Sequence, residues 1–218
     1  MKYLITGITG QIGTIFSKLV LDQGDQVIGV HRRTANSNFD RLEESGIIKN
    51  PLLRLCSGDV TDYSSIDRLV KQHKPDRIIN FAASSHVHES FKTPVANLDI
   101  TGAGCTNILE SIRNNMGYKY SPKFVQISSS EMFGSNFSSE SDGQGVYHYS
   151  MHDCGKRMLE SLERYPENYW QDENTPLSAN SPYAAAKIYA HNMTELYRRA
   201  YDIYANSIIL FNTESEYR

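Results

Sequence analysis

The feature that most constrains the fold is a glycine-rich turn close to the N-terminus. Gly7, Gly10 and Gly13 follow a short apolar run (3–5) and precede helix-spaced apolar residues and a second apolar run (27–30). This order is typical of a βαβ unit that binds a dinucleotide, because the glycines allow a tight turn and close backbone approach to a pyrophosphate. The following helix N-terminus offers N–H donors to the phosphates. The residues expected at the pyrophosphate are Gly7, Ile8, Thr9, Gly10, Gln11, Ile12 and Gly13.

The rest of the chain continues the alternation of strand and helix patterns. Further apolar runs are followed or preceded by helix-spaced apolar residues, which predicts an α/β fold. We expect a Rossmann-type doubly wound parallel sheet with helices on both faces, in a single domain spanning residues 1–218. The expected further strands are 52–56, 77–81, 124–127 and 205–210, and the expected helices include 40–45, one capped by Asp62, 97–114 and 182–201.

Only the stretch 135–170 does not fit the alternation. Its first part, 135–145, is rich in Ser and Gly, a flexible polar composition. A short amphipathic helix around Met158, Leu159 and Leu162 is expected after it. We interpret 135–170 as an insertion that acts as a lid or interaction element, with a functionless surface decoration as the alternative.

The end of the second strand indicates which dinucleotide binds. An NAD enzyme usually places Asp or Glu about 20 residues past the glycine motif, whereas this chain has His31, Arg32 and Arg33. A guanidinium can clamp a 2′-phosphate with two hydrogen bonds, so NADP is expected rather than NAD; two solvated arginines are the alternative. Asp59 follows the third strand and is expected to accept from the adenine amino group, with a pure capping role as its rival.

Two clusters of polar residues predict a catalytic site. Tyr183 and Lys187 lie four residues apart in a predicted helix and therefore share a face. A lysine cation near a phenol lowers the phenol's pKa and yields a general acid/base. Ser129 and Glu131 follow the fifth strand, at the edge where open α/β sheets bind ligands. The alternatives are an ordinary half-buried Tyr with a solvated Lys, and a Ser/Glu helix cap.

Composition excludes several other classes of function. The net charge of −3 and the absence of a Lys/Arg cluster give no footprint for nucleic acid. No apolar run approaches the roughly 20 residues that span a membrane. Three widely spaced cysteines form neither a disulfide framework nor a zinc pattern, so a cytoplasmic protein is expected. His86, His88 and Glu89 lack a second ligand cluster, and no metal site is expected.

Together these motifs resemble the extended short-chain dehydrogenase/reductase family, and within it the GDP-mannose 4,6-dehydratases. The resemblance covers nearly the whole chain outside 135–170. It rests on order and spacing rather than on one motif. The segments that carry it are 7–11, 32–33, 58–62, 82–87, 129–134, 181–187 and 210–212.

The resemblance implies an NADP-dependent dehydratase that converts GDP-mannose to GDP-4-keto-6-deoxymannose. Tyr183, helped by Lys187 and Ser129, would take the C4 hydroxyl proton, and Glu131 would take the C5 proton before water leaves C6. Substrate contacts are implied for Ser85, Ser130, Glu131 and Asn212. Further cofactor contacts are implied for Val60, Phe81, Ala82, Ala83, Ser85, Tyr183, Lys187 and Arg218.

Relatives in that family continue into a C-terminal portion that completes the sugar-nucleotide pocket, and here that portion is expected to be largely absent. Thr213 also replaces the family's His. Two alternatives therefore stay open: an epimerase or decarboxylase of the same family, and a catalytically inactive NADP-binding module. A homodimer or higher homo-oligomer through the 97–114 and 182–201 helices is expected, although burial against the sheet explains the same residues. They are Ile108, Leu109, Ile112, Met193, Leu196 and Tyr197.

Overall fold

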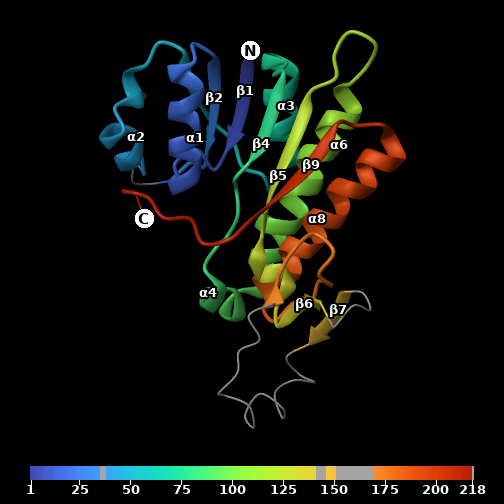
Figure 1. Cartoon of the computed structure of the whole chain (residues 1–218). Helices are drawn as coiled ribbons and strands as arrows, with labels where there is room; N and C mark the ends of the chain where they lie inside the picture. The colour runs from blue at the N-terminus through green and yellow to red at the C-terminus, as the bar shows by residue number, and fades with distance from the viewer. Residues whose placement is uncertain (35–37, 141–145, 151–168, 218) are drawn as a thin grey trace.

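The chain folds around a six-stranded parallel sheet with the strand order β3-β2-β1-β4-β5-β9 (Figure 1). This computed structural model describes residues 1–34, 38–140, 146–150 and 169–217. Each predicted strand is present, which confirms the doubly wound α/β class. The strands are β1 (Lys2–Thr6), β2 (Gln26–His31), β3 (Leu53–Ser57), β4 (Arg77–Asn80), β5 (Lys123–Ser129) and β9 (Ala205–Leu210).

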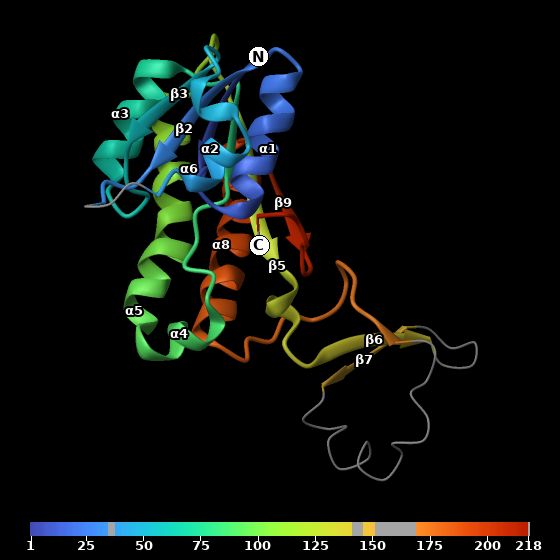
Figure 2. The same cartoon turned by 90° about the vertical axis from the view of Figure 1, so that its left-hand side faces the viewer.

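Helices cover the two faces of the sheet unequally. Figure 2 shows α1 on one side of the strands and α3 and α6 on the other. α8 packs beside α6 and against β5 and β9. The bounds are α1 (Gln11–Asp22), α2 (Asp40–Glu44), η1 (Ile47–Lys49), α3 (Tyr63–His73), α4 (Val87–Lys92), α5 (Pro94–Asn97), α6 (Gly104–Asn115), η3 (Ser130–Phe133) and α8 (Pro182–Tyr201).

The larger core lies between the sheet and α3, α6 and α8. Its sheet side is a register-matched row in which Leu4 pairs with Ile78 and Ile78 pairs with Phe124. All three side chains are fully buried, as is Ile108 of α6 opposite them. The next row along the same strands is polar: Thr6 pairs with Asn80 and Asn80 pairs with Gln126. The apolar layer therefore ends one row before the carboxyl ends of these strands.

The predicted helix over 97–114 is interrupted in the structure. α5 passes into a π-helical segment, η2 (Leu98–Ala103), before α6 begins. Periodicity of apolar residues does not reveal such a local widening, which is frequent at functional sites. The prediction that Asp62 caps α3 is confirmed, because Asp62 accepts from the Ser64 backbone N–H at 2.9 Å. Ser181 caps α8 in the same way by accepting from Ala184 N at 3.1 Å.

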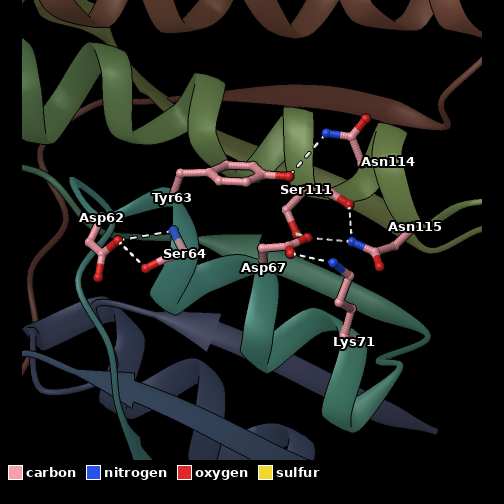
Figure 3. A network of polar contacts seen from close by, with 8 residues as sticks. All are labelled: Asp62, Tyr63, Ser64, Asp67, Lys71, Ser111, Asn114 and Asn115. Atoms are coloured by element: carbon pink, nitrogen blue, oxygen red, sulfur yellow. Dashed lines mark hydrogen bonds and ion pairs between the residues drawn. The ribbon is translucent and has the colours of Figure 1, made fainter.

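A polar network fastens α3 to α6 (Figure 3). The Asp67 carboxylate is buried and accepts from Lys71 Nζ at 2.7 Å, Asn115 Nδ2 at 2.6 Å and Ser111 Oγ at 3.3 Å. Burial by itself would raise the pKa of Asp67, but the bonds from Lys71, Asn115 and Ser111 outweigh burial and lower it. The paired helices are thereby fixed behind β1, β4 and β5.

The stretch interpreted as an insertion leaves the main sheet after η3. Its described residues form a three-stranded antiparallel sheet of β6 (Asn136–Glu140), β7 (Val146–Ser150) and β8 (Tyr169–Trp170), which projects beyond the carboxyl ends of the main strands (Figure 1). The flexible loop expected over 135–145 is therefore in part a strand, because Asn136–Glu140 is paired on both edges. The helix expected around Met158, Leu159 and Leu162 lies outside the described residues.

The chain enters and leaves this excursion through a closed neck. Ser178 N donates to Met132 O at 2.8 Å, and Asn180 Nδ2 donates to Ser135 Oγ at 2.8 Å. Gly134 has φ +58°, and a Cβ there would lie 2.0 Å from Ser178 O. Only glycine therefore fits at this crossing.

The residues named for a dimer interface are mostly internal. Ile108, Leu109 and Ile112 are fully buried, and Tyr197 is 6% exposed, so packing within the chain accounts for them. Leu196 is 46% exposed. In the part of the chain that the structure describes, no helix is long and apolar enough to cross a membrane.

Candidate active site

A cleft of about 610 Å³ lies at the carboxyl ends of the parallel strands. The glycine turn forms one wall, and the start of α8 forms the opposite wall. Most of the residues predicted for the site meet here. They are Gly7, Thr9, Gly10, Gln11, Ile12, Gly13, Arg32, Val60, Phe81, Ala82, Ala83, Ser85, Ser129, Glu131, Tyr183, Lys187 and Asn212.

The glycine turn is packed too tightly for side chains. Gly7 has φ +67°, and a Cβ on Gly13 would lie 2.3 Å from Gly7 O. Gly10 N donates to Gly7 O at 3.0 Å, which closes the turn before α1 begins at Gln11. Ile8 is fully buried, so it can offer only its backbone to the cleft. The turn therefore brings bare backbone and a helix N-terminus to the cleft, as a pyrophosphate requires.

Tyr183, Ser129 and Glu131 form one interacting group in the cleft. Ser129 ends β5 and accepts from Glu131 N at 3.3 Å, which leaves its hydroxyl hydrogen for the Tyr183 phenol, with which it is hydrogen bonded. Burial raises the pKa of Tyr183, the Ser129 bond lowers it, and the Glu131 charge raises it again. Ser90 Oγ of α4 accepts from Tyr183 N at 3.2 Å and helps to hold the start of α8.

Lys187 is not among the groups that shift the pKa of Tyr183, although the sequence predicts that it lowers this pKa. Its Nζ donates to Ile127 O at 2.6 Å and lies 5.7 Å from the centroid of the Tyr183 ring. The net pKa of Tyr183 is raised, because burial and Glu131 outweigh the Ser129 bond. Lys187 is only 3% exposed, and burial lowers its own pKa to about 8. Tyr183 and Lys187 lie on one face of α8 as predicted, but the hydrogen bond of Lys187 Nζ goes to the Ile127 carbonyl of β5 rather than to the phenol oxygen.

The end of β2 brings basic and amide groups to the far end of the cleft. Arg32 lines it together with His31 and Asn38, whose Nδ2 donates to Thr9 Oγ1 at 3.2 Å. Arg33 is exposed and is not among the lining residues, although it neighbours Arg32. Arg218 lies outside the described residues.

Asp59 makes local hydrogen bonds in this structure. Its Oδ1 accepts from both the backbone N–H and the hydroxyl of Thr61 at 2.9 Å, while Val60 rather than Asp59 lines the cleft. Ser130, expected near the substrate, begins η3 and is likewise not among the lining residues.

The loop after β4 is held from the π-helical side. Asn97 Nδ2 donates to Ser84 O at 2.7 Å, and Ser84 N donates to Thr101 Oγ1 at 3.0 Å. Both backbone groups of Ser84 are thus occupied by buried side chains, and Ser85 is presented to the cleft. Sequence reasoning missed this clamp. The available sequence signal was the presence of the polar residues Asn97 and Thr101 in a predicted helix whose other face is apolar.

Sequence reasoning placed Asn212 of the segment after β9 at the site, but it missed the buried amides of the central strands. Phe211 and Thr213 line the cleft, and Gln11 Nε2 donates to Thr213 O at 3.1 Å. Asn80 ends β4 and Gln126 lies in the middle of β5, and both are buried. An amide residue next to apolar residues in each predicted strand was the sequence signal.

The comparisons with known proteins agree with this geometry. A sequence model of the family described as GDP-mannose 4,6 dehydratase matches residues 4–164 and 161–218. The GDP-mannose 4,6-dehydratase of Yersinia enterocolitica is 37% identical over 100% of this chain and 51% of its own length, and the human protein is 33% identical over 99% and 50%. The chain thus spans about half the length of the curated relatives it matches.

Solved structures show the same fold. A dTDP-glucose 4,6-dehydratase from Streptomyces venezuelae, with NAD and TYD bound, superposes with a TM-score of 0.72 at 24% identity, covering 100% of this chain and 58% of that one. Pal from Bacillus thuringiensis superposes with a TM-score of 0.73 at 25% identity over 100% and 58%. On the match of the family model across nearly the whole sequence, this chain belongs to the GDP-mannose 4,6-dehydratase family of short-chain dehydrogenases/reductases.

Proposed function

We propose that this protein is an NADP-dependent nucleotide-sugar 4,6-dehydratase that acts on GDP-mannose. The observation that carries the proposal is the group at the end of β5 and the start of α8. There Tyr183 is hydrogen bonded to Ser129, and the charge of Glu131 raises its pKa. A general acid/base for oxidation of a sugar hydroxyl, with a carboxylate beside it, suits an elimination of water from the sugar. The curated relatives with this name support the substrate.

The cofactor cradle fits a dinucleotide. The Cβ-free surfaces of Gly7 and Gly13 and the N-terminus of α1 suit the pyrophosphate. Arg32 at the end of β2 would pair with a 2′-phosphate, and Glu131 is the sole carboxylate among the described residues that line the cleft, far along the chain from β2. This arrangement supports NADP rather than NAD. Val60, Phe81, Ala82 and Ala83 are small or apolar enough to admit the rings that both dinucleotides share.

The chain's own residues would then divide the proton chemistry. Tyr183 takes the proton of the sugar C4 hydroxyl, with the Ser129 hydrogen bond stabilising the phenolate. NADP supplies the hydride acceptor for C4 and later the hydride donor for C6. Glu131 removes the C5 proton, which the new 4-keto group has made acidic, and passes it to the C6 hydroxyl, which leaves as water. Tyr183 later returns to C5 the proton that it took from the C4 hydroxyl. Electrons balance because the oxidation at C4 is returned as a reduction at C6.

Glu131 separates this proposal from the epimerase alternative. A 4-epimerase needs a general acid/base at C4 but no base beside C5, and Glu131 lies in the cleft close enough to raise the pKa of Tyr183. Ser85 and Asn212, which also line the cleft, are proposed to contact the sugar nucleotide.

The test is incubation of the protein with GDP-mannose and NADP⁺. The expected product is lighter by one water and absorbs in alkali as a 4-keto sugar. UDP-glucose serves as the substrate control for the epimerase alternative, since an epimer has unchanged mass. NADPH binding without turnover of any of these sugars would instead support an inactive cofactor-binding module and contradict the proposal.

A further inference from the structure

A continuous chain of buried hydrogen bonds runs across three strands to Lys187. Thr6 Oγ1 donates to Asn80 Oδ1 at 2.5 Å, and Asn80 Nδ2 donates to Gln126 Oε1 at 2.7 Å. Gln126 Nε2 then donates to Ile127 O at 3.0 Å, the same carbonyl that accepts from Lys187 Nζ at 2.6 Å. The chain follows the polar row of the sheet, in which these strand residues are register partners.

The orientation of every amide in this chain is set from the end at Ile127. Ile127 O can only accept, so Gln126 must turn its nitrogen towards it and its oxygen towards Asn80. At the other end Asn80 turns its oxygen towards Thr6, so the Thr6 hydroxyl donates to Asn80 and accepts from Ala82 N at 3.3 Å. The Ile127 carbonyl thus sets the direction of the whole chain, and the Ala82 N–H is compatible with it.

Burial gives the chain its rigidity. Thr6 and Gln126 are fully buried, and Asn80 is 1% exposed, so water cannot replace a broken bond. Thr6 immediately precedes the glycine turn, and Ala82 belongs to the loop that lines the cleft. The chain of bonds thus joins the cofactor turn and this loop to the peptide that holds Lys187.

We propose that Gln126, tied back through Asn80 to Thr6, is a positioning residue that fixes the Ile127 carbonyl and thereby sets the place of the Lys187 ammonium beside Tyr183. The proposal rests on the proposed function for its effect on turnover, but its structural content is independent of the substrate. Gln126 touches neither the cleft nor the reacting atoms, and it acts only through Lys187.

The kinetic test uses Gln126→Met, which keeps the length of the side chain and removes both bonds. We expect kcat for the sugar nucleotide to fall about tenfold with KM nearly unchanged, the loss of one buried hydrogen bond in the transition state. In a Lys187→Met background the same change should cause no further fall, since its route of action is already gone. A further fall in kcat when Gln126→Met is added to Lys187→Met, or an unchanged kcat in Gln126→Met alone, would overturn the proposal.

A second variant separates positioning from folding. Asn80→Leu/Gln126→Met replaces both buried amides by apolar groups, which removes the unsatisfied Asn80 amide and leaves only the Thr6 hydroxyl without its acceptor, so part of the stability should be restored. Turnover should stay low, because Ile127 is still untethered. Recovery of kcat together with stability would show a merely structural role. Ser111→Ala, which removes a buried hydroxyl from the α3–α6 network, is the matched control and should leave kcat unchanged.

Crystal structures of the wild-type chain, Gln126→Met and Ser111→Ala decide the geometry without any substrate. We expect Lys187 Nζ to move relative to Tyr183 by more than about 0.5 Å in Gln126→Met, beyond the tolerance of catalytic groups, and to stay in place in Ser111→Ala. An unmoved Lys187 in Gln126→Met would overturn the inference. Absence of turnover in the wild-type chain would instead count against the proposed function alone.

Discussion

Lys187 Nζ lies 2.6 Å from Ile127 O and 5.7 Å from the centroid of the Tyr183 ring, so this lysine is held by β5 and not by the phenol it accompanies on α8. A buried ammonium whose recorded hydrogen bond goes to a neutral carbonyl is costly to the fold. The site therefore maintains a cation where folding alone would favour an apolar side chain.

Replacing Lys187 by Met should stabilise the protein while it lowers turnover to a measurable residual rate. Burial lowers the pKa of Lys187 from 10.5 to about 8, and at 1.36 kcal/mol per unit this shift corresponds to on the order of 3 kcal/mol. The unfolded chain binds the extra proton between these two pKa values, so the penalty is full below pH 8 and fades towards pH 10.5.

Urea unfolding of the wild type and Lys187→Met at pH 7 and pH 10 checks this prediction. The stability gain should be larger at pH 7. A gain that is equal at both values, or a loss at pH 7, would show that the buried charge is not what destabilises the site.

Glu131→Gln should stop the elimination without impairing cofactor binding. Loss of a general base costs about 10²- to 10⁴-fold in rate, and the neutral amide should also lower the pKa of Tyr183, whose value the Glu131 charge raises. The measurement is product mass together with NADPH titration. Glu195→Gln, a substitution on the same helix as Tyr183 but outside the cleft lining, is the control. Surviving dehydration would remove Glu131 from its proposed role.

Arg32→Ala should weaken NADPH binding far more than NADH binding. A lost charge-assisted pair is worth about 1.5–3 kcal/mol, or roughly 10- to 100-fold in Kd. Arg33→Ala should have the smaller effect, because Arg33 does not line the cleft. Calorimetry with both nucleotides makes the comparison, and equal weakening of NADPH and NADH would argue against a 2′-phosphate contact at Arg32.

Gly13→Ala should disrupt the glycine turn, because its Cβ would lie 2.3 Å from Gly7 O. We expect loss of dinucleotide binding and a lower melting temperature. Gly117→Ala is the matched control, since a Cβ there meets nothing within 4 Å. A Gly13→Ala protein that binds NADPH normally would show that the turn can relax.

Asp67→Asn should destabilise the fold by about 1–3 kcal/mol, the cost of breaking a buried charged hydrogen-bond group. The pKa of Asp67 is lowered despite its burial, so its contribution is present above its unfolded-state pKa and is lost as pH falls through the folded-state value. Denaturant unfolding at pH 7 and pH 3 measures both effects. Asp22→Asn in the exposed Lys18–Asp22 pair should change stability much less.

Sequence patterns predicted the sheet well because period and glycine placement are local properties. The Gly7–Gly13 turn, the strand ends and the helix Pro182–Tyr201 all follow from short-range rules. The site was less predictable where its chemistry depends on contacts across strands. The partner of Lys187 is a backbone carbonyl, which every residue possesses, and so no sequence signal could identify Ile127.

The interruption of the predicted 97–114 helix and the local contacts of Asp59 both depend on partners outside their own sequence pattern. Asp59 Oδ1 accepts from Thr61 N, and Asn97 at the end of α5 donates to Ser84 O. Sequence alone gives the inventory of donors and acceptors but not the distances that decide between them.

The closed neck at Gly134 and Ser178 has a consequence for how this protein can change over evolutionary time. Because Ser178 is bonded to Met132 and Asn180 to Ser135, the ends of the intervening stretch are fixed beside each other. Changing the number of residues between them costs little, since loop-closure entropy grows only with the logarithm of length. Residues can therefore be inserted or deleted between Gly134 and Ser178, close to Glu131, without changing the register of the main parallel sheet.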